Sequence, residues 1–290
     1  MTSGGAVSDH DGRVIAGRWE LVKQIGSGSA GTLWSATDLE NFSSVAVKIA
    51  RTGDRSFDRE SAFQASVESP YIAKMLASGV ADCGDGVRAY LVQELVSGQN
   101  LRDVLRTGTP HNVDVTAWAY GLLRALVVIH AEGIVHRDIK PSNIVIPFTA
   151  AGTPSPQPKL VDFGTAEREP GCDDKASARG TVLYMSPEQA RGSGVGPASD
   201  IYSLGLVILE CLTGYRAFNL PAIESLVART QRPPWIPDGL PAHWHDLIHA
   251  MTAMDPALRP TATQAIAMLT RPRVRQDAAC AANEALALAV

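Results

Sequence analysis

The sequence is organised around one polar stretch, His136-Arg137-Asp138-Ile139-Lys140-Pro141-Ser142-Asn143. It brings an acid, a base and an amide close together, and its proline restricts the backbone between them. Alone, the stretch could be an ordinary polar loop, since His, Asp and Asn are common in loops. Three further stretches, at residues 26–31, 45–60 and 162–164, decide whether this stretch is an ordinary loop or carries chemistry.

Length and composition indicate an ordinary folded protein. With 290 residues the chain is long for one core and short for two unrelated domains, so one unit in two lobes fits. An apolar share of 45% and a charged share of 19% argue against wholesale disorder. The net charge of −4, without a basic stripe carrying aromatic residues, leads us to expect no nucleic-acid partner.

The cysteines and apolar runs bear on the cellular compartment. The four cysteines form no CxxC pair and lie far apart, at Cys83, Cys172, Cys211 and Cys280. This favours free thiols in a reducing compartment over a metal site or disulfides. Residues 1–11 lack the apolar core of a secretion signal. The longest apolar run, 118–129, contains Arg124 and is shorter than the about 20 residues of a membrane span. We expect a cytoplasmic chain without a membrane span.

The first part of the chain has strand patterns and one helical pattern. Residues 1–17 are rich in Gly, Ser and Asp and are expected to form a flexible leader. Strands are predicted at 19–25, 33–36, 45–49, 72–77 and 88–96. Residues 57–67 lack this alternation and predict a helix that ends before Ser69-Pro70.

The second part is mostly helical. Helices are predicted at 113–130, 199–213, 243–254 and 261–269. Short strands at 143–146 and 159–161 flank the proline-rich residues 147–158, which we interpret as a flexible surface insertion. The expected lobes are 18–95 and 96–270. Residues 271–290 start basic and become Ala-rich, which predicts either a helix docked on the body or the start of a linker.

The glycine-rich stretch contains Gly26, Gly28 and Gly31 in a G-x-G-x-x-G pattern, a weak signal alone. A dinucleotide fold would open a helix directly after the glycines. Here residues 32–34 continue as a strand. A turn whose N–H groups approach phosphates between two strands fits better, and the alternative is a plain Gly-rich hairpin.

Lys48 lies in the apolar run 45–49, so its side chain points either to solvent or inward toward a partner. A buried ammonium needs a carboxylate, and Glu60 on the predicted helix is the candidate. The alternative is a surface pair of little consequence.

Asp162 follows a predicted strand and precedes Phe163 and the freely rotating Gly164. A carboxylate at a strand end can hold a cation. Mg²⁺ takes few protein oxygens and keeps phosphate oxygens in its shell. Asn143 could supply a second protein oxygen.

Together these stretches resemble the catalytic domain of a eukaryotic-type protein Ser/Thr kinase, of the group found in bacteria, over residues 18–270. The motifs occur in the family's order, namely Gly26-x-Gly28-x-x-Gly31-x-Leu33, Val45-Ala46-Val47-Lys48, Glu60, His136-Arg137-Asp138 through Asn143, Asp162-Phe163-Gly164 and Ser186-Pro187-Glu188. Asp200 and Arg259 match its later structural motifs. The resemblance implies a bilobal α+β fold, with a small antiparallel sheet lobe carrying one helix and a larger, mostly α-helical lobe.

The resemblance also implies catalytic roles. Asp138 should orient the substrate hydroxyl and accept its proton, and Lys140 should stabilise the transferring γ-phosphate. A lysine at that position marks the Ser/Thr-directed class. Thr181 resembles the hydroxyl that bridges these two side chains. His136 should be structural, supporting the region of Phe163.

The implied cofactors are ATP and Mg²⁺ or Mn²⁺. Asn143 and Asp162 should hold the metal, and Lys48, positioned by Glu60, should hold the α- and β-phosphates. The other expected nucleotide contacts are Ile25, Gly26, Gly28, Gly31 and Leu33 in the glycine loop, Ala46 and Val145 around the adenine ring, and Gln93, Glu94 and Val96 in a hinge at 93–96. Glu188 and Arg259 should form a buried structural ion pair.

Some positions depart from the family pattern. Leu33 stands where Val is usual, and Ser186 replaces Ala, as in bacterial members. Gln64, one turn after Glu60, stands where an apolar residue is common, so we expect that helix to be held less firmly. The insertion 147–158 is longer than usual.

Arg137 resembles family members that need a phosphate on the activation segment, since a buried guanidinium requires an anion. Ser177 lies four residues before Thr181, at the spacing of the usual site, and we predict autophosphorylation there, with a homodimer as one route. Protein substrates with Ser or Thr acceptors are the expected partners.

Two alternatives remain at this stage. A catalytically dead relative acting as a scaffold would normally have lost Lys48, Asp138 or Asp162, and all three are present. A small-molecule kinase of the same fold fits less well, because residues 180–188 resemble a platform for peptides.

Overall fold

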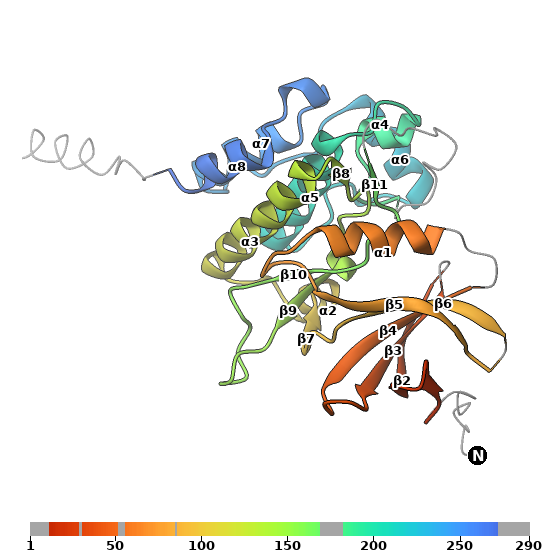
Figure 1. The fold of residues 1–290 in the computed structure, drawn as a ribbon. Helices are drawn as coiled ribbons and strands as arrows, with labels where there is room; N and C mark the ends of the chain where they lie inside the picture. Colours follow the sequence, from red (N-terminus) through yellow and green to blue (C-terminus); the bar gives the residue numbers. More distant parts are fainter. Residues whose placement is uncertain (1–11, 29–30, 52–55, 85, 169–181, 272–290) are drawn as a thin grey trace, which may run out of the picture.

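The computed structural model describes residues 12–28, 31–51, 56–84, 86–168 and 182–271. These residues form a strand-rich lobe followed by a helix-rich lobe, with the helix α1 lying between the sheet and most of the other helices (Figure 1). The predicted α+β architecture in two lobes is therefore confirmed.

The first lobe is a six-stranded antiparallel sheet with the strand order β1-β2-β3-β4-β6-β5. Its strands are β1 (Val14–Ile15), β2 (Trp19–Ser27), β3 (Gly31–Asp38), β4 (Ser44–Ala50), β5 (Met75–Asp82) and β6 (Val87–Glu94). Alternate residues of a strand share a face. That periodicity gathers Leu21, Trp34 and Val47 into one buried cluster. The helix α1 (Ser56–Ser66) packs Phe57 against Leu91 of β6.

The predicted flexible leader is wrong at its C-terminal end. Residues 14 and 15 form β1, in which Ile15 pairs with Trp19 of β2. Ile15 is fully buried in the core of the sheet. Gly17 has a φ of 69°, which lets the chain turn sharply between the two strands. An apolar pair too short to show alternation gave no strand signal in the sequence.

The strand predicted at 72–77 lies three residues further along, as β5. Ile72 instead makes an isolated parallel bridge with Leu160 of the second lobe. Ala73 donates its N–H to the Leu160 carbonyl at 3.0 Å, and Leu160 donates to the Tyr71 carbonyl at 2.8 Å. Residues 71–73 therefore form a backbone seam between the lobes.

A second passage between the lobes follows β6. Residues 95–97 lead into a three-stranded sheet of order β10-β9-β7. Its strands are β7 (Gly98–Asn100), β9 (Ile144–Pro147) and β10 (Lys159–Leu160), while β8 (Ile134–Val135) pairs with β11 (Glu167–Arg168). The antiparallel pairing of β9 with β10 confirms the expected strands on either side of the insertion.

The insertion folds back on the helical lobe. The hydroxyls of Thr149 and Thr153 lie 2.7 Å apart across its turn. The Trp118 indole N–H donates to the carbonyl of Ser155 at 2.9 Å. The insertion is thereby fixed to the face of one helix, where the sequence had suggested a plain surface excursion.

The second lobe is built on two long helices, α3 (Asn112–Ala131) and α5 (Pro197–Thr213), whose buried residues share one core. Around them lie α2 (Leu101–Thr107), α4 (Pro187–Arg191), α6 (Ala222–Gln231), α7 (Ala242–Met251) and α8 (Ala262–Leu269). Of these, α2, α4 and α6 were not predicted. Among the described residues, α3 alone is long and apolar enough to cross a membrane, and half of its most apolar window is buried inside the protein, as in a core helix.

Candidate active site

The loop 136–143 follows β8 and ends in a 3-10 turn, Pro141–Asn143. Within it the Asp138 carboxylate accepts a hydrogen bond from Lys140 Nζ at 2.6 Å and one from Asn143 Nδ2 at 3.2 Å. Asn143 Nδ2 also donates to the Asp138 carbonyl at 3.0 Å. The structure thus brings the three expected side chains of the loop to one point.

The backbone of this loop is fixed by a buried carboxylate. Asp200 of α5 accepts the N–H groups of His136 and Arg137, each at 2.8 Å, and lies 2.9 Å from His130 Nε2. Burial opposes its charge, but the His130 contact and these N–H groups hold the Asp200 pKa below its usual value. Arg137 has a φ of 68°, a conformation that non-glycine residues adopt at a cost of about 1–3 kcal/mol. Asp200 therefore holds the loop in a shape that it would not favour alone.

The ring of His136 is fully buried and packs on Phe163, with ring centroids 5.0 Å apart. Burial lowers the pKa of this imidazole from its usual 6.5, so the ring is held neutral. Its expected structural role is consistent with this packing.

A second charged group joins three elements. Lys48 of β4 contacts Glu60 of α1 at 2.5 Å and Asp162, which follows β10, at 2.8 Å. Burial disfavours the ammonium, but the charges of Asp162 and Glu60 outweigh it and raise the Lys48 pKa. Burial likewise opposes the Asp162 carboxylate, and Lys48 overcomes this and lowers its pKa to about 2. The inward orientation and the pairing with Glu60 are confirmed, and the surface alternative is wrong.

The glycines differ in what they make room for. A Cβ on Gly31 would lie 2.0 Å from the Ile49 carbonyl oxygen, so the packing of β3 on β4 excludes a side chain there. A Cβ on Gly28 would meet nothing within 4 Å, and one on Gly26 would touch only Leu33. Packing does not explain these two glycines. An open backbone is what close approach by a phosphate requires.

The other expected nucleotide contacts lie on strands of both lobes. Leu33 is paired with Lys48 across the sheet, and Ile25 of β2 is 46% exposed. Ala46 of β4 is paired with Gln93, and Val145 of β9 is paired with Lys159 in the second lobe.

The predicted hinge divides into two parts. Gln93 and Glu94 end β6, whereas Val96 lies in the crossing between the sheets. Gln93 pairs with β4 on one side and β5 on the other. The N–H of Glu94 donates to the Lys74 carbonyl, and its carboxylate contacts Lys159 at 2.8 Å. Unpaired backbone for an adenine ring is therefore more available after Glu94 than at Gln93.

Asp162 and Asn143 fit the expected metal site. Asn143 uses its amide nitrogen for Asp138, which leaves the amide oxygen as the atom to meet a cation. In the described part of the chain no three His, Cys, Asp or Glu side chains form a cluster that could hold a metal by themselves. Mg²⁺ bound together with phosphate oxygens suits such a sparse set of ligands. Thr181 and Ser177 lie outside the described residues.

Comparison with known families agrees with this geometry. The model of the protein kinase domain family matches residues 19–269. The chain belongs to the protein kinase domain family. Members of this family use ATP and a divalent metal.

Several bacterial kinases are similar to this kinase domain. Serine/threonine-protein kinase PknA of Mycobacterium tuberculosis is 35% identical over 269 residues, which are 87% of this chain and 60% of that protein. Serine/threonine-protein kinase PknB of the same species is 34% identical over 84% of this chain and 41% of its own length. The probable serine/threonine-protein kinase PkwA of Thermomonospora curvata is 37% identical over 65% of this chain and 25% of its own. The chain thus spans at most about three fifths of these relatives.

The structural ion pair of the kinase domain is present as predicted. Arg259 donates to both carboxylate oxygens of Glu188, at 2.6 and 2.9 Å. The Ser199 hydroxyl donates to the same carboxylate at 2.6 Å. These hydrogen bonds outweigh burial and lower the Glu188 pKa.

Sequence reasoning missed the partner of Arg137. The guanidinium pairs with Glu167 of β11, whose other oxygen lies 3.7 Å from Arg59 of α1. The anion that Arg137 requires is thus already supplied in part by the protein. A carboxylate 30 residues away gave no signal in the sequence.

Two buried polar side chains were also missed. Gln64 of α1 donates to Gln93 Oε1 at 2.7 Å and to the Ala73 carbonyl at 3.0 Å. This glutamine is therefore bonded in place, which corrects the expectation that it loosens the helix. Arg229 of α6 is fully buried and donates to the carbonyls of Leu183 and Met185, both at 2.8 Å. An arginine in an amphipathic helix usually indicates a solvated face.

Proposed function

We propose that this chain is a protein Ser/Thr kinase, which transfers the γ-phosphate of ATP to Ser or Thr hydroxyls of protein substrates. The observation that carries this is the joint geometry of two groups, Asp138 with Lys140 and Asn143, and Lys48 with Glu60 and Asp162. Each group supplies one half of what phosphoryl transfer needs, positioning and charge stabilisation.

The residues of the loop act on the acceptor. Asp138 orients the substrate hydroxyl and takes its proton as the oxygen attacks phosphorus. The ammonium of Lys140 lies 2.6 Å from that carboxylate, so its positive charge is placed where negative charge develops on the transferring group. The presence of a lysine at this position supports Ser and Thr as acceptors.

Residues of both lobes act on the nucleotide. Lys48, held by Glu60, binds the α- and β-phosphates, and the open backbone at Gly26 and Gly28 covers them. Asn143 and Asp162 hold the divalent ion, for which we propose Mg²⁺ with Mn²⁺ as a substitute. The ion neutralises phosphate charge. Ala46 and Val145 enclose the adenine ring.

The test is phosphate transfer from ATP to a generic protein substrate, with Mg²⁺ or Mn²⁺. We expect transfer by the wild type and a loss of at least about a hundredfold in kcat for Asp138→Asn, because a general base contributes about 10²–10⁴-fold. Asp246→Asn, on the exposed side of α7, is the matched control and should keep full activity. An inactive wild type would support the alternative of a scaffold protein. Phosphate transfer to small molecules alone would support the alternative of a small-molecule kinase.

We also propose autophosphorylation at Ser177. Arg137 and Arg59 together carry two positive charges around the single carboxylate of Glu167, so this cluster has charge left for a phosphate. After incubation with ATP and Mg²⁺, mass spectrometry should find phosphate on Ser177, and Ser177→Ala should lower activity severalfold while the exposed Ser193→Ala does not. An active wild type with unmodified Ser177 would refute this.

The route of this modification is open to a kinetic test. A homodimer that forms only for the reaction gives a rate of phosphorylation per molecule that rises with protein concentration. Modification within one molecule gives a rate independent of concentration. We propose the route through a homodimer.

We propose a cytoplasmic location for this domain. The support is that both described cysteines, Cys83 and Cys211, are buried and form no disulfide, which suits a reducing compartment. Fractionation of cells that produce the full-length protein, with an antibody to this domain and protease protection, tests it.

A further inference from the structure

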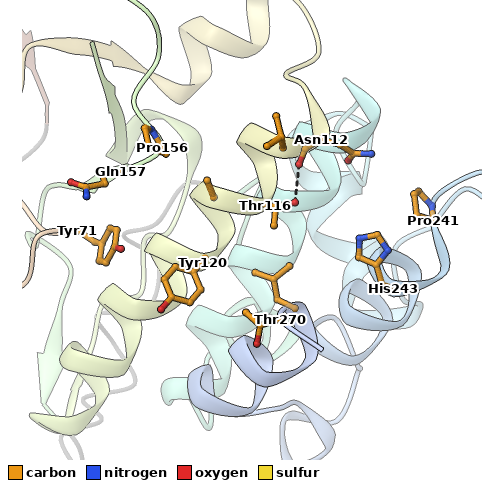
Figure 2. Close-up of a pocket in the computed structure, with 12 residues that line it drawn as sticks. Tyr71, Asn112, Thr116, Tyr120, Pro156, Gln157, Pro241, His243 and Thr270 are labelled. Atoms are coloured by element: carbon orange, nitrogen blue, oxygen red, sulfur yellow. Dashed lines mark hydrogen bonds between the residues drawn. The ribbon is translucent and has the colours of Figure 1, made fainter. Parts of the chain in front are cut away.

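A groove of about 940 Å³ lies on the helical lobe (Figure 2), and none of the residues that line it belongs to the active-site groups described above. Its floor is one face of α3, where Asn112, Thr116 and Tyr120 follow one another at helical spacing. Tyr71 and Gln157 line one side, and Thr270 at the end of α8 lines the other. At 1.5 Å per residue, the floor is about 12 Å long.

The walls of the groove are fixed by contacts of their own. Tyr71 packs so closely on α3 that a Cβ at Gly121 would lie 2.7 Å from its ring. The insertion wall is tied to α3 through the Trp118 hydrogen bond to Ser155. A groove with such walls is ready to receive an occupant without rearrangement.

Apolar side chains at the groove are open to solvent. Val113 in the first turn of α3 is 73% exposed, and Leu269 lies at the opposite wall. A large aliphatic side chain this exposed beside a groove is a place where burial by a partner is favourable.

The chain leaves the described structure at this groove. Thr270 lines it, and the described residues end at Arg271. Residues 278–290 contain only two polar side chains, Asn283 and Glu284, among alanines, leucines, a cysteine and a valine. This composition has a high helix propensity, and helical spacing would place Leu286 and Val290 on one face, where both would need apolar contact.

The connecting residues are long enough for a return. Six residues lie between Arg271 and Ala278, and the seven steps from one Cα to the other reach up to about 25 Å when extended. A helix over 278–290 would be about 20 Å long, enough to cover a floor of about 12 Å. We propose that residues 278–290 of this chain dock in the groove between α3, the 147–158 insertion and the end of α8.

Cys280 provides a measurement on the unaltered chain. Docking should slow its alkylation, followed by peptide mass spectrometry, by at least about fivefold relative to the variant Val113→Glu. That variant places a charge at an exposed helix position, where the fold tolerates it. Ile223→Glu is the matched control, because Ile223 is also the second residue of its helix and is 78% exposed. The control should leave Cys280 as slow as in the wild type.

A second measurement does not depend on the cysteine. Hydrogen exchange in peptides covering 112–120 should be slowest in the wild-type chain of residues 1–290. It should be faster both in a chain ending at Arg271 and in the variant Leu286→Asp. Equal exchange in all three, or equal Cys280 alkylation in Val113→Glu and wild type, would overturn the proposal.

The segment could instead bind to a second copy of the chain or to a membrane. Each of these gives a distinct outcome that also overturns the proposal. Protection of Cys280 that is lost on dilution means that a second copy supplies the segment. Protection that appears only with vesicles of anionic phospholipid means that the segment binds a membrane surface, with Arg271, Arg273 and Arg275 beside it.

Discussion

The loop 136–143 and the helix α1 each carry a charged residue of the active site, but they are held in opposite ways. The loop is held through its backbone, since Asp200 accepts two of its N–H groups and Gln189 donates to the Arg137 carbonyl at 2.8 Å. The helix is held through the ends of side chains, by Glu60 on Lys48 and Gln64 on Gln93.

This difference separates a fixed part of the site from an adjustable one. Backbone bonds to a buried carboxylate do not depend on whether nucleotide is bound. We expect the contact between Glu60 and Lys48 to depend on it, because Lys48 also contacts Asp162, where phosphate and metal are expected. We therefore propose that the loop sets the position of the acceptor and that α1 responds to the nucleotide.

The largest effect is expected at the loop anchor. Asp200→Ala leaves His130 and two buried N–H groups without their acceptor, and breaking such a buried charged contact costs about 3–5 kcal/mol. Urea unfolding should show this loss, and the exposed Asp246→Ala should stay within about 0.5 kcal/mol of the wild type. A loss below about 1 kcal/mol would mean that the loop holds its shape unaided.

A smaller effect is expected at the α1 link. Gln64→Leu removes the donor of both the buried Gln93 Oε1 and the Ala73 carbonyl and should cost about 1–3 kcal/mol, whereas Gln93→Leu removes one of the two acceptors of Gln64 and should cost less. The double variant should cost less than the sum of the two, which a double-mutant cycle measures. The KM for ATP should rise in the single variants. In the double variant it should lie closer to the wild-type value. Strict additivity would show that the two amides act independently.

The smallest effect is a pH dependence from His136. Because the folded protein keeps this ring neutral, the unfolded chain binds a proton below pH 6.5 that the folded chain does not. Stability contributed by the neutral ring is therefore present above that pH and lost progressively as pH falls below it. His136→Phe should flatten the slope of unfolding free energy between pH 6.5 and 5, whereas the exposed His111→Gln should not. Equal slopes in all three proteins would contradict the neutral buried ring.

The sequence was informative where residues of one function lie close together or at fixed spacing. The groups at 26–33, 45–48, 136–143 and 162–164 predicted the site, and strand alternation predicted most of the sheet. The pairing of Arg259 with Glu188 followed from the family resemblance.

The sequence was uninformative where the partner is a backbone atom or lies far away. Arg229 contacts carbonyl oxygens, which every residue has, so no residue type marks the interaction. The bond between Gln64 and Gln93 depends on α1 packing over β6, which neither segment shows alone. Gln189, which donates to the Arg137 carbonyl, lies 52 residues from it and was not singled out in the sequence.

The backbone seam at residues 71–73 has a consequence for motion. Within the described residues, the backbone joins the sheet lobe to the helical lobe at two places, this seam just before β5 and the crossing 95–97 just after β6. Both belong to the same edge of the sheet, since the strand order ends in β6-β5. Two attachment points define an axis, so the lobes can rotate about that edge more easily than they can slide. The opposite edge, β1 and β2 with Gly26 near its end, then travels farthest for a given rotation, so we expect a small change of angle to admit or release a nucleotide.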